Sequence, residues 1–206
     1  MKREPTIFIV DDDPAFLESL GVLVTSMGLQ TQVFSSGLDY LNQFDPQAPG
    51  VLILDVRMPQ ISGLAMQERL SKEALTPPII ILTGHADVPT AIRALRQGAV
   101  EFLQKTLSET ELREAIQKAI LRDADTRRVH DRRRRIKGLL DLLTAPERQV
   151  LDLVLAGCPN KTIATRLGVS RRAVEDRRAR LMQKLQVESL PELVRLATDA
   201  GLRPSD

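Results

Sequence analysis

The stretch Ile7-Phe8-Ile9-Val10-Asp11-Asp12-Asp13 decides how the first half of this 206-residue chain folds. It is a short apolar run that stops at aspartate, and Val51-Leu52-Ile53-Leu54-Asp55 repeats the pattern. Such runs are typical of strands that are buried on both faces of a parallel sheet. If the two strands are neighbours, their aspartates meet at one edge. Carboxylate oxygens there suit Mg²⁺, whose open coordination positions can take phosphate.

The three consecutive aspartates have two interpretations. Aspartate is a preferred N-cap, and Pro14 stands where the first helical residue would be, so Asp13 is expected to cap a helix. Asp11 and Asp12 precede this cap, and two like charges side by side are costly unless a cation or a lysine offsets them. We therefore expect Asp11 and Asp12 to hold a metal ion.

Apolar runs and helical patterns alternate along residues 1–122. Further strands are expected at residues 30–34, 79–82 and 100–103, and helices at 14–27, 38–44, 64–70, 89–97 and 108–122. This alternation predicts an α/β fold with a doubly wound, parallel, five-stranded sheet whose ligand site lies at the carboxyl ends of the strands. The residues expected at those ends include Asp11, Asp55, Thr83 and Lys105.

Four strings resemble the receiver domain of two-component response regulators over residues 1–122: VDDD (10–13), LDVRMP followed by SG (54–63), ILTGH (81–85) and EFLQK (101–105). The resemblance implies a flavodoxin-like receiver that is phosphorylated on Asp55 by a sensor histidine kinase. It implies a Mg²⁺ cofactor held by Asp11, Asp12, Asp55 and the backbone carbonyl of Arg57. Thr83 and Lys105 would contact the phosphoryl group, and Phe102 would be the aromatic residue that turns inward on activation.

One position departs from the family pattern. The family usually has proline after the lysine, in a cis peptide that sets the direction of the lysine side chain, whereas Thr106 follows Lys105 here. A cis bond before a residue other than proline costs about 2.5–4 kcal/mol. The loop is therefore expected to be either strained or trans, and the placing of Lys105 is the open question at this site.

Charge divides the chain in two. Residues 1–125 carry 11 Lys and Arg against 17 Asp and Glu, a net charge of −6, whereas residues 126–206 carry 18 against 10, a net charge of +8. A basic second half suggests that it meets a polyanion. Residues 123–140 are expected to form a basic, helical linker, because arginines gather there while apolar residues almost vanish. This tract is either solvated or in contact with DNA.

Composition argues against several classes of site. The single cysteine, Cys158, excludes an internal disulfide and a CxxC metal site. His85 and His130 are far apart and lack a cysteine partner, which argues against zinc and against Cys-His nucleophilic chemistry. No apolar run approaches the roughly 18 residues of a membrane span, so we expect a cytoplasmic protein with no membrane partner.

Residues 141–206 are expected to form a small all-α helix-turn-helix domain, with helices at about 145–156, 160–167, 171–185 and 191–200. The spacing of Ile163, Leu167 and Val174 would hold two helices at a fixed crossing, but a generic helical hairpin would show much the same pattern. The string LTAPERQVLDLVLAGCPNKTIATRLGVSRRAVEDRRARLMQKLQVESLPELVRLA, residues 143–197, resembles the LuxR-type helix-turn-helix domain. With a receiver in front of it, the chain resembles a response regulator of the FixJ/NarL type.

This second resemblance implies double-stranded DNA as a partner. It makes Glu147 a scaffold residue, places Asn160 and Lys161 near phosphates, and makes the helix from Arg171 to Lys184 the recognition helix. The last helix would carry a dimer face through Leu193, Val194 and Ala197.

The recognition helix departs from its relatives. They commonly have Thr-Val-Lys-Val-His where this chain has Ala173-Val174-Glu175-Asp176-Arg177, so we expect a different operator. If Val174, Leu181 and Leu185 face inward, the helical period turns the following residues outward, with Glu175 on the flank: Arg172, Asp176, Ala179, Arg180 and Gln183. Glu175 and Asp176 either accept a hydrogen bond from cytosine or pair with arginines of the same helix. Arg171, Arg177 and Arg178 are expected on the DNA backbone.

These patterns predict a transcription regulator, not an enzyme beyond the receiver's own Mg-dependent phosphoryl transfer and dephosphorylation. Phosphorylation of Asp55 would favour receiver pairing through the surface of residues 88–105, and the homodimer would bind DNA. One alternative is a phosphorylation-independent regulator whose receiver is only a dimerisation or protein-interaction module. Another is a haloacid-dehalogenase-type phosphatase, suggested by Asp11 and Asp13; against it, no acidic pair follows Lys105 and no cap domain is evident.

Overall fold

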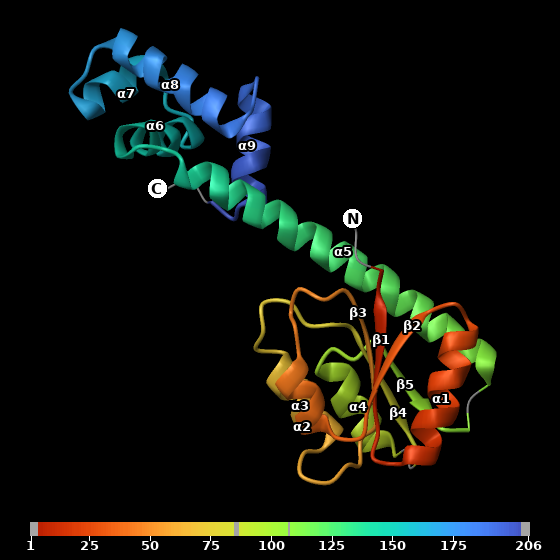
Figure 1. The fold of residues 1–206 in the computed structure, drawn as a ribbon. Coiled ribbons are helices and arrows are strands. Elements are labelled where there is room, and N and C mark those ends of the chain that lie inside the picture. Colours follow the sequence, from red (N-terminus) through yellow and green to blue (C-terminus); the bar gives the residue numbers. More distant parts are fainter. Residues whose placement is uncertain (1–3, 85–86, 107, 203–206) are drawn as a thin grey trace. The chain divides into compact units, whose positions relative to one another are not determined.

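The computed structural model of the chain describes residues 4–84, 87–106 and 108–202 (Figure 1). His85 lies outside these residues. The chain forms two compact units, Met1–Arg128 and Val129–Asp206, each of which is treated by itself. Within the described residues, no helix is long and apolar enough to cross a membrane.

The first unit contains a parallel five-stranded sheet with the strand order β2-β1-β3-β4-β5, which confirms the predicted fold class. The strands are β1 (Thr6–Val10), β2 (Gln30–Phe34), β3 (Gly50–Leu54), β4 (Ile79–Thr83) and β5 (Glu101–Gln104). β3 is buried along its whole length between β1 and β4. Its register places Leu54 beside Val10, so the aspartates that follow these two residues leave the sheet as neighbours.

Helices cover both faces of this sheet (Figure 1). On one face, α1 (Pro14–Ser26) and α5 (Glu109–Asp141) pack against Val51 and Ile53 of β3. On the other, α2 (Gly37–Gln43), α3 (Gly63–Leu70) and α4 (Val88–Arg96) pack against Leu52 and Leu54. Successive side chains of a strand point to opposite faces, so an unbroken apolar run serves two cores.

Asp13 caps α1, as the sequence predicts. Its Oδ1 accepts hydrogen bonds from the backbone N–H groups of Ala15 at 3.0 Å and Phe16 at 3.2 Å, and Pro14 occupies the first turn. These bonds satisfy donors that have no partner within the helix. The cap therefore fixes where α1 begins relative to the end of β1.

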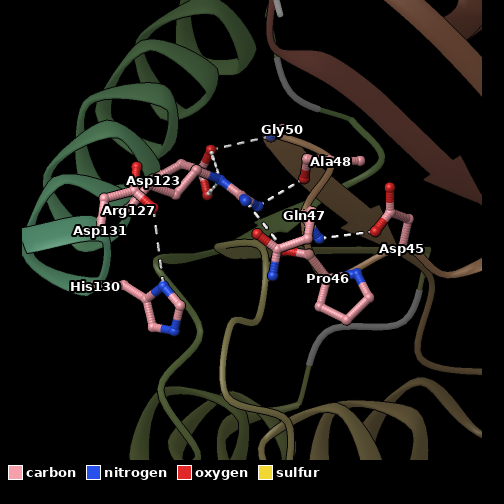
Figure 2. A network of polar contacts seen from close by, with 9 residues as sticks. All are labelled: Asp45, Pro46, Gln47, Ala48, Gly50, Asp123, Arg127, His130 and Asp131. Carbon is pink, nitrogen blue, oxygen red and sulfur yellow. Dashed lines mark hydrogen bonds and ion pairs between the residues drawn. The ribbon is translucent and has the colours of Figure 1, made fainter. Parts of the chain in front are cut away.

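The expected helix at 108–122 and the expected helical linker form one unbroken helix, α5, which continues to Asp141. Inside the first unit, this helix is bonded to the first residue of β3 and to the loop before it (Figure 2). Asp123 accepts hydrogen bonds from the Gly50 backbone N–H at 3.0 Å and from Arg127 Nε at 2.9 Å. The Arg127 guanidinium also donates to the carbonyl oxygens of Pro46 at 3.0 Å and Ala48 at 2.6 Å. Asp123 and Arg127 thus belong to the packed receiver, although they lie beyond residue 122.

The second unit contains the end of α5 followed by α6 (Ala145–Leu155), α7 (Asn160–Leu167), α8 (Arg171–Leu185) and α9 (Leu190–Asp199). The bounds of α7 and α8 agree with the predicted ones. Gly168 ends α7 in the left-handed conformation with φ 64°, which lets the chain turn into α8. Ile136 and Leu140, from the expected linker, are buried in this unit's core.

Candidate functional site

The carboxyl edge of the sheet brings Asp11 and Asp55 together. Asp55 is only 4 % exposed, and Asp11 is also buried. Backbone N–H groups hold one oxygen of each: Asp13 N–H donates to Asp11 Oδ1 at 3.0 Å, and Arg57 N–H to Asp55 Oδ2 at 2.5 Å. Gly63 backs the turn after Asp55, and a Cβ at Gly63 would lie 2.1 Å from the Asp55 carbonyl oxygen. The position therefore requires glycine.

Lys105 reaches both carboxylates. Its Nζ lies 2.6 Å from Asp11 Oδ2 and 3.3 Å from Asp55 Oδ1. The ring of Phe16 lies below the same ammonium, with 4.3 Å from Nζ to the ring centroid. The bond between Lys105 and Thr106 is trans, as are all peptide bonds of the described residues. A loop without proline thus still delivers the lysine to the site.

The environment changes the proton affinities of these groups. Burial raises the pKa of the Asp55 carboxyl, and the Lys105 charge and the Arg57 N–H offset only part of this effect. Burial alone would lower the pKa of Lys105, but its hydrogen bond to Asp11 and the charge of Asp55 reverse that and raise it. Lys105 thus offsets part of the cost of burying the Asp55 charge.

The other predicted residues of this edge differ in exposure. Thr83 ends β4 and is buried, and Phe102 is partly buried against the core on the α3 and α4 face. Asp12 and Arg57 are both exposed. In the part of the chain that is described, no three His, Cys, Asp or Glu side chains form a group that could hold a metal ion. The predicted Asp11, Asp12 and Asp55 trio is thus assembled only as the Asp11 and Asp55 pair, because Asp12 turns outward.

Helix α8 presents the predicted polar face. Val174, Leu181 and Leu185 are buried, as expected. The residues predicted to face outward are all exposed: Arg172, Asp176, Ala179, Arg180 and Gln183. Arg177 is partly buried, and Lys161 at the start of α7 is exposed. Arg178 Nη1 donates to Asn160 Oδ1 at 3.1 Å, which joins α8 to α7.

The two acidic residues of α8 differ. Glu175 Oε1 lies 3.1 Å from Arg171 Nε, one helical turn earlier, so it pairs within its own helix. Asp176 forms no ion pair with any of the described residues. The pairing interpretation therefore applies to Glu175, and Asp176 is the acidic side chain that remains available to a partner.

Lys184 is a scaffold residue and does not belong to the exposed set. Its Nζ lies 2.6 Å from the buried Glu147 Oε2 and donates to the Leu142 carbonyl oxygen at 3.2 Å. Glu147 Oε2 also accepts a hydrogen bond from the Thr144 backbone N–H at 2.8 Å. The bond from Lys184 is the largest cause that lowers the pKa of Glu147, to about 2. This pair joins α6 to the end of α8.

The expected dimer face on α9 is wrong for two of its three residues. Leu193 and Ala197 are buried in the core of the second unit, whereas Val194 is exposed. Residues four apart share one face of a helix, and the face that carries Leu193 and Ala197 is the one that packs.

Comparison with known proteins identifies both units. Residues 7–117 match the family described as response regulator receiver domain, and residues 141–197 match the bacterial regulatory proteins of the luxR family. The chain is 40 % identical to the transcriptional regulatory protein FixJ of Azorhizobium caulinodans over 206 residues, which is 100 % of this chain and 98 % of that protein.

The alignments with other relatives span both units of this chain. The response regulator protein TodT of Pseudomonas putida is 41 % identical over 194 residues, covering 94 % of this chain and 86 % of TodT. The solved structure of the response regulator StyR has a TM-score of 0.85 at 38 % identity, covering 95 % of this chain and 99 % of that one. The chain therefore belongs to the two-component response regulators of the FixJ/NarL type, which join a receiver domain to a LuxR-type DNA-binding domain.

Proposed function

We propose that this response regulator accepts a phosphoryl group on Asp55 from a sensor histidine kinase and then regulates transcription as a DNA-bound homodimer. The observation that carries the proposal is the ammonium of Lys105 between two buried carboxylates, Asp11 at the end of β1 and Asp55 at the end of β3. Phosphoryl transfer needs its nucleophile fixed and its oxygens neutralised more than it needs a base. A buried carboxylate beside a fixed cation meets both needs.

The step replaces one bond by another. The P–N bond of the phosphohistidine breaks, a bond forms between phosphorus and a carboxylate oxygen of Asp55, and the imidazole leaves with the electron pair of the broken bond. Lys105 would then pair with a phosphoryl oxygen, and the hydroxyl of Thr83 would donate to another. The backbone N–H of Lys105 donates a hydrogen bond to the Thr83 carbonyl oxygen at 2.9 Å. This bond supports the assignment because it keeps the two residues together.

Mg²⁺ fits the donor set. Asp11 Oδ2 and Asp55 Oδ1 are directed at one cationic centre, Lys105 Nζ, and such paired carboxylate oxygens suit a hard ion that keeps much of its own water. Asp11 and Asp55 would hold the ion together with the Arg57 backbone carbonyl, and water would take the remaining positions. The bound ion would supply charge neutralisation for the phosphoryl oxygens.

An apolar stripe on α4 supports receiver pairing. Val88, Ile92 and Leu95 recur at helical spacing and are 71 %, 46 % and 48 % exposed. Contiguous apolar side chains at a surface mark interaction sites. The stripe lies within residues 88–105, the surface that would change when Thr83 and Phe102 respond to the phosphoryl group. Pairing of two receivers would bring two copies of α8 to half-sites about one helical turn of DNA apart.

The first test is acyl-phosphate formation with a small phosphodonor. The purified chain is incubated with acetyl phosphate and Mg²⁺, and the phosphorylated form is resolved on a phosphate-affinity gel and mapped by mass spectrometry. We expect phosphate on Asp55, a shift from monomer to dimer in solution, and tighter binding to a selected operator. Operator binding that is equally tight without phosphate would favour the phosphorylation-independent alternative.

A further inference from the structure

Phe16 touches the Lys105 ammonium, although neither the receiver motifs nor the proposed chemistry assigns it a role. The residue lies in the first turn of α1 and is partly buried, with its side chain against the core between α1 and α5. Its ring centroid lies 4.3 Å from Lys105 Nζ, within the roughly 6 Å over which an aromatic face attracts a cation. The ring therefore faces the site as well as the core.

A chain of contacts leads from Lys105 through Asp11 and Asp13 to Phe16 and back to Lys105. Lys105 Nζ binds Asp11 Oδ2, and Asp11 Oδ1 accepts the Asp13 N–H. Asp13 Oδ1 in turn accepts the Phe16 N–H at 3.2 Å, and the Phe16 ring returns to Lys105. The loop after β1 and the start of α1 are thus built as one piece with the ammonium. These contacts fix the backbone of Phe16 relative to Asp11, and therefore fix the point from which its ring reaches Lys105.

We propose that Phe16 is a positioning residue for phosphoryl transfer, holding the Lys105 ammonium over Asp55 while leaving its hydrogen atoms free. A lysine ammonium has three donors and a flexible four-carbon stem. A carboxylate orients it through a directed hydrogen bond, whereas the face of an aromatic ring attracts the charge as a whole and takes the place of no oxygen acceptor. Asp11, Asp55 and an incoming phosphoryl oxygen can therefore each take one hydrogen.

The role follows from where the charge is needed. During transfer an Asp55 oxygen becomes bonded to phosphorus, so the contact at 3.3 Å between Lys105 Nζ and Asp55 Oδ1 changes. Asp11 and the Phe16 ring then keep the ammonium at the site. This inference rests on the proposed phosphorylation of Asp55, but the contact itself is testable without phosphate.

The experiment compares Phe16→Leu with Phe16→Tyr in the full chain. Leucine keeps the apolar packing and loses the aromatic face, whereas tyrosine keeps both. Leu23→Ala is the matched control, because Leu23 packs against the same core seven residues further along α1. Two quantities are measured: the initial rate of Asp55 phosphorylation by acetyl phosphate with Mg²⁺, and the NMR chemical shift of the Lys105 ε-protons without phosphodonor.

We expect Phe16→Leu to slow phosphorylation by about threefold, as the loss of a partly exposed cation–π contact predicts. The Lys105 ε-protons, shielded by the ring in the wild type, should move downfield. Phe16→Tyr should keep both wild-type values, and Leu23→Ala should lower thermal stability while leaving both unchanged. A wild-type rate in Phe16→Leu would overturn the proposal, as would a slower rate with no change in the ε-proton shift. If the wild type takes no phosphate, the proposed function fails, whereas the proton shift still decides whether Phe16 holds the ammonium.

Discussion

The acidic residues of the receiver site and those of α8 are of the same chemical type in opposite surroundings. Asp11 and Asp55 are buried, and each has one oxygen on a backbone N–H and the other on Lys105. Asp176 on α8 is exposed and forms no ion pair among the described residues. A buried charge has its geometry set before any partner arrives, whereas an exposed one acquires its geometry from the partner.

The same contrast occurs within six residues of α5. The side chains of Asp123 and Arg127 are 5 % and 15 % exposed, and they share further bonds with the loop before β3. The side chains of Asp125 and Arg128 are 65 % and 80 % exposed and bond to each other at 2.7 Å. Both pairs join an aspartate and an arginine on the same helix. We expect burial and the number of shared hydrogen bonds, more than the geometry of the pair, to decide how much each pair contributes to the free energy of unfolding.

The largest effect is expected from Asp55→Asn at the buried site. The amide has nearly the same shape, can still accept the Arg57 N–H, and offers no carboxylate to phosphorus. We expect acyl-phosphate formation with acetyl phosphate to be abolished while the thermal unfolding temperature stays within a few degrees of the wild type. Phosphate on another residue at wild-type yield would contradict the assignment of Asp55.

The next largest effect should come from Arg127→Ala, with Arg128→Ala as its matched control. Removing one partner of a buried, hydrogen-bonded pair costs about 3–5 kcal/mol, whereas an exposed pair contributes about 0–1 kcal/mol. The chain has one tyrosine and no tryptophan, and Tyr40 is buried in the first unit, so tyrosine fluorescence during urea unfolding follows the receiver alone. Equal losses of stability in the two variants would show that burial does not separate the pairs.

The parts that sequence patterns predict well are those where one signal dominates. Strand ends, the Asp13 cap and the inward face of α8 follow from periodicity and capping chemistry that neighbouring elements reinforce. Charge-rich segments are harder to predict, because a charged residue is read as exposed unless its partner is known. Arg127 has its partners at Pro46 and Ala48, about 80 residues away, and Lys184 has its partner in Glu147. The contact between Phe16 and Lys105 was not predicted for the same reason, because the two residues are far apart in the sequence.

A smaller effect is expected from the buried carboxylate of the second unit. The pKa of Glu147 is about 2 in the folded chain and near 4.5 when unfolded. Because the folded value is the lower one, its stabilisation is complete above about pH 4.5 and is lost as the pH falls toward 2. Glu147→Gln should therefore be less stable than the wild type at pH 7, and the difference between them should shrink over this window. Helix content measured by circular dichroism during urea unfolding at several pH values tests this, and a constant difference would contradict it.

The exposed acidic residues of α8 should affect DNA recognition and leave stability unchanged. Acidic side chains repel DNA phosphates. An aspartate or a glutamate can, however, accept a hydrogen bond from cytosine N4 in the major groove, and such a bond depends on the base sequence. Asp176 has no partner in the described part of the chain, so we predict that Asp176→Ala relaxes the preference at one base pair by roughly 1–3 kcal/mol.

Two variants on the same helix sharpen this last prediction. Glu175→Ala should have the smallest effect, because Glu175 already pairs with Arg171. Arg177→Ala should weaken all sequences alike and lower the salt dependence by about one unit, as expected for a phosphate contact. Selection of binding sites from random DNA, repeated for each variant, separates the outcomes. If the wild type and Asp176→Ala select identical motifs, Asp176 contacts no base and does not contribute to sequence recognition.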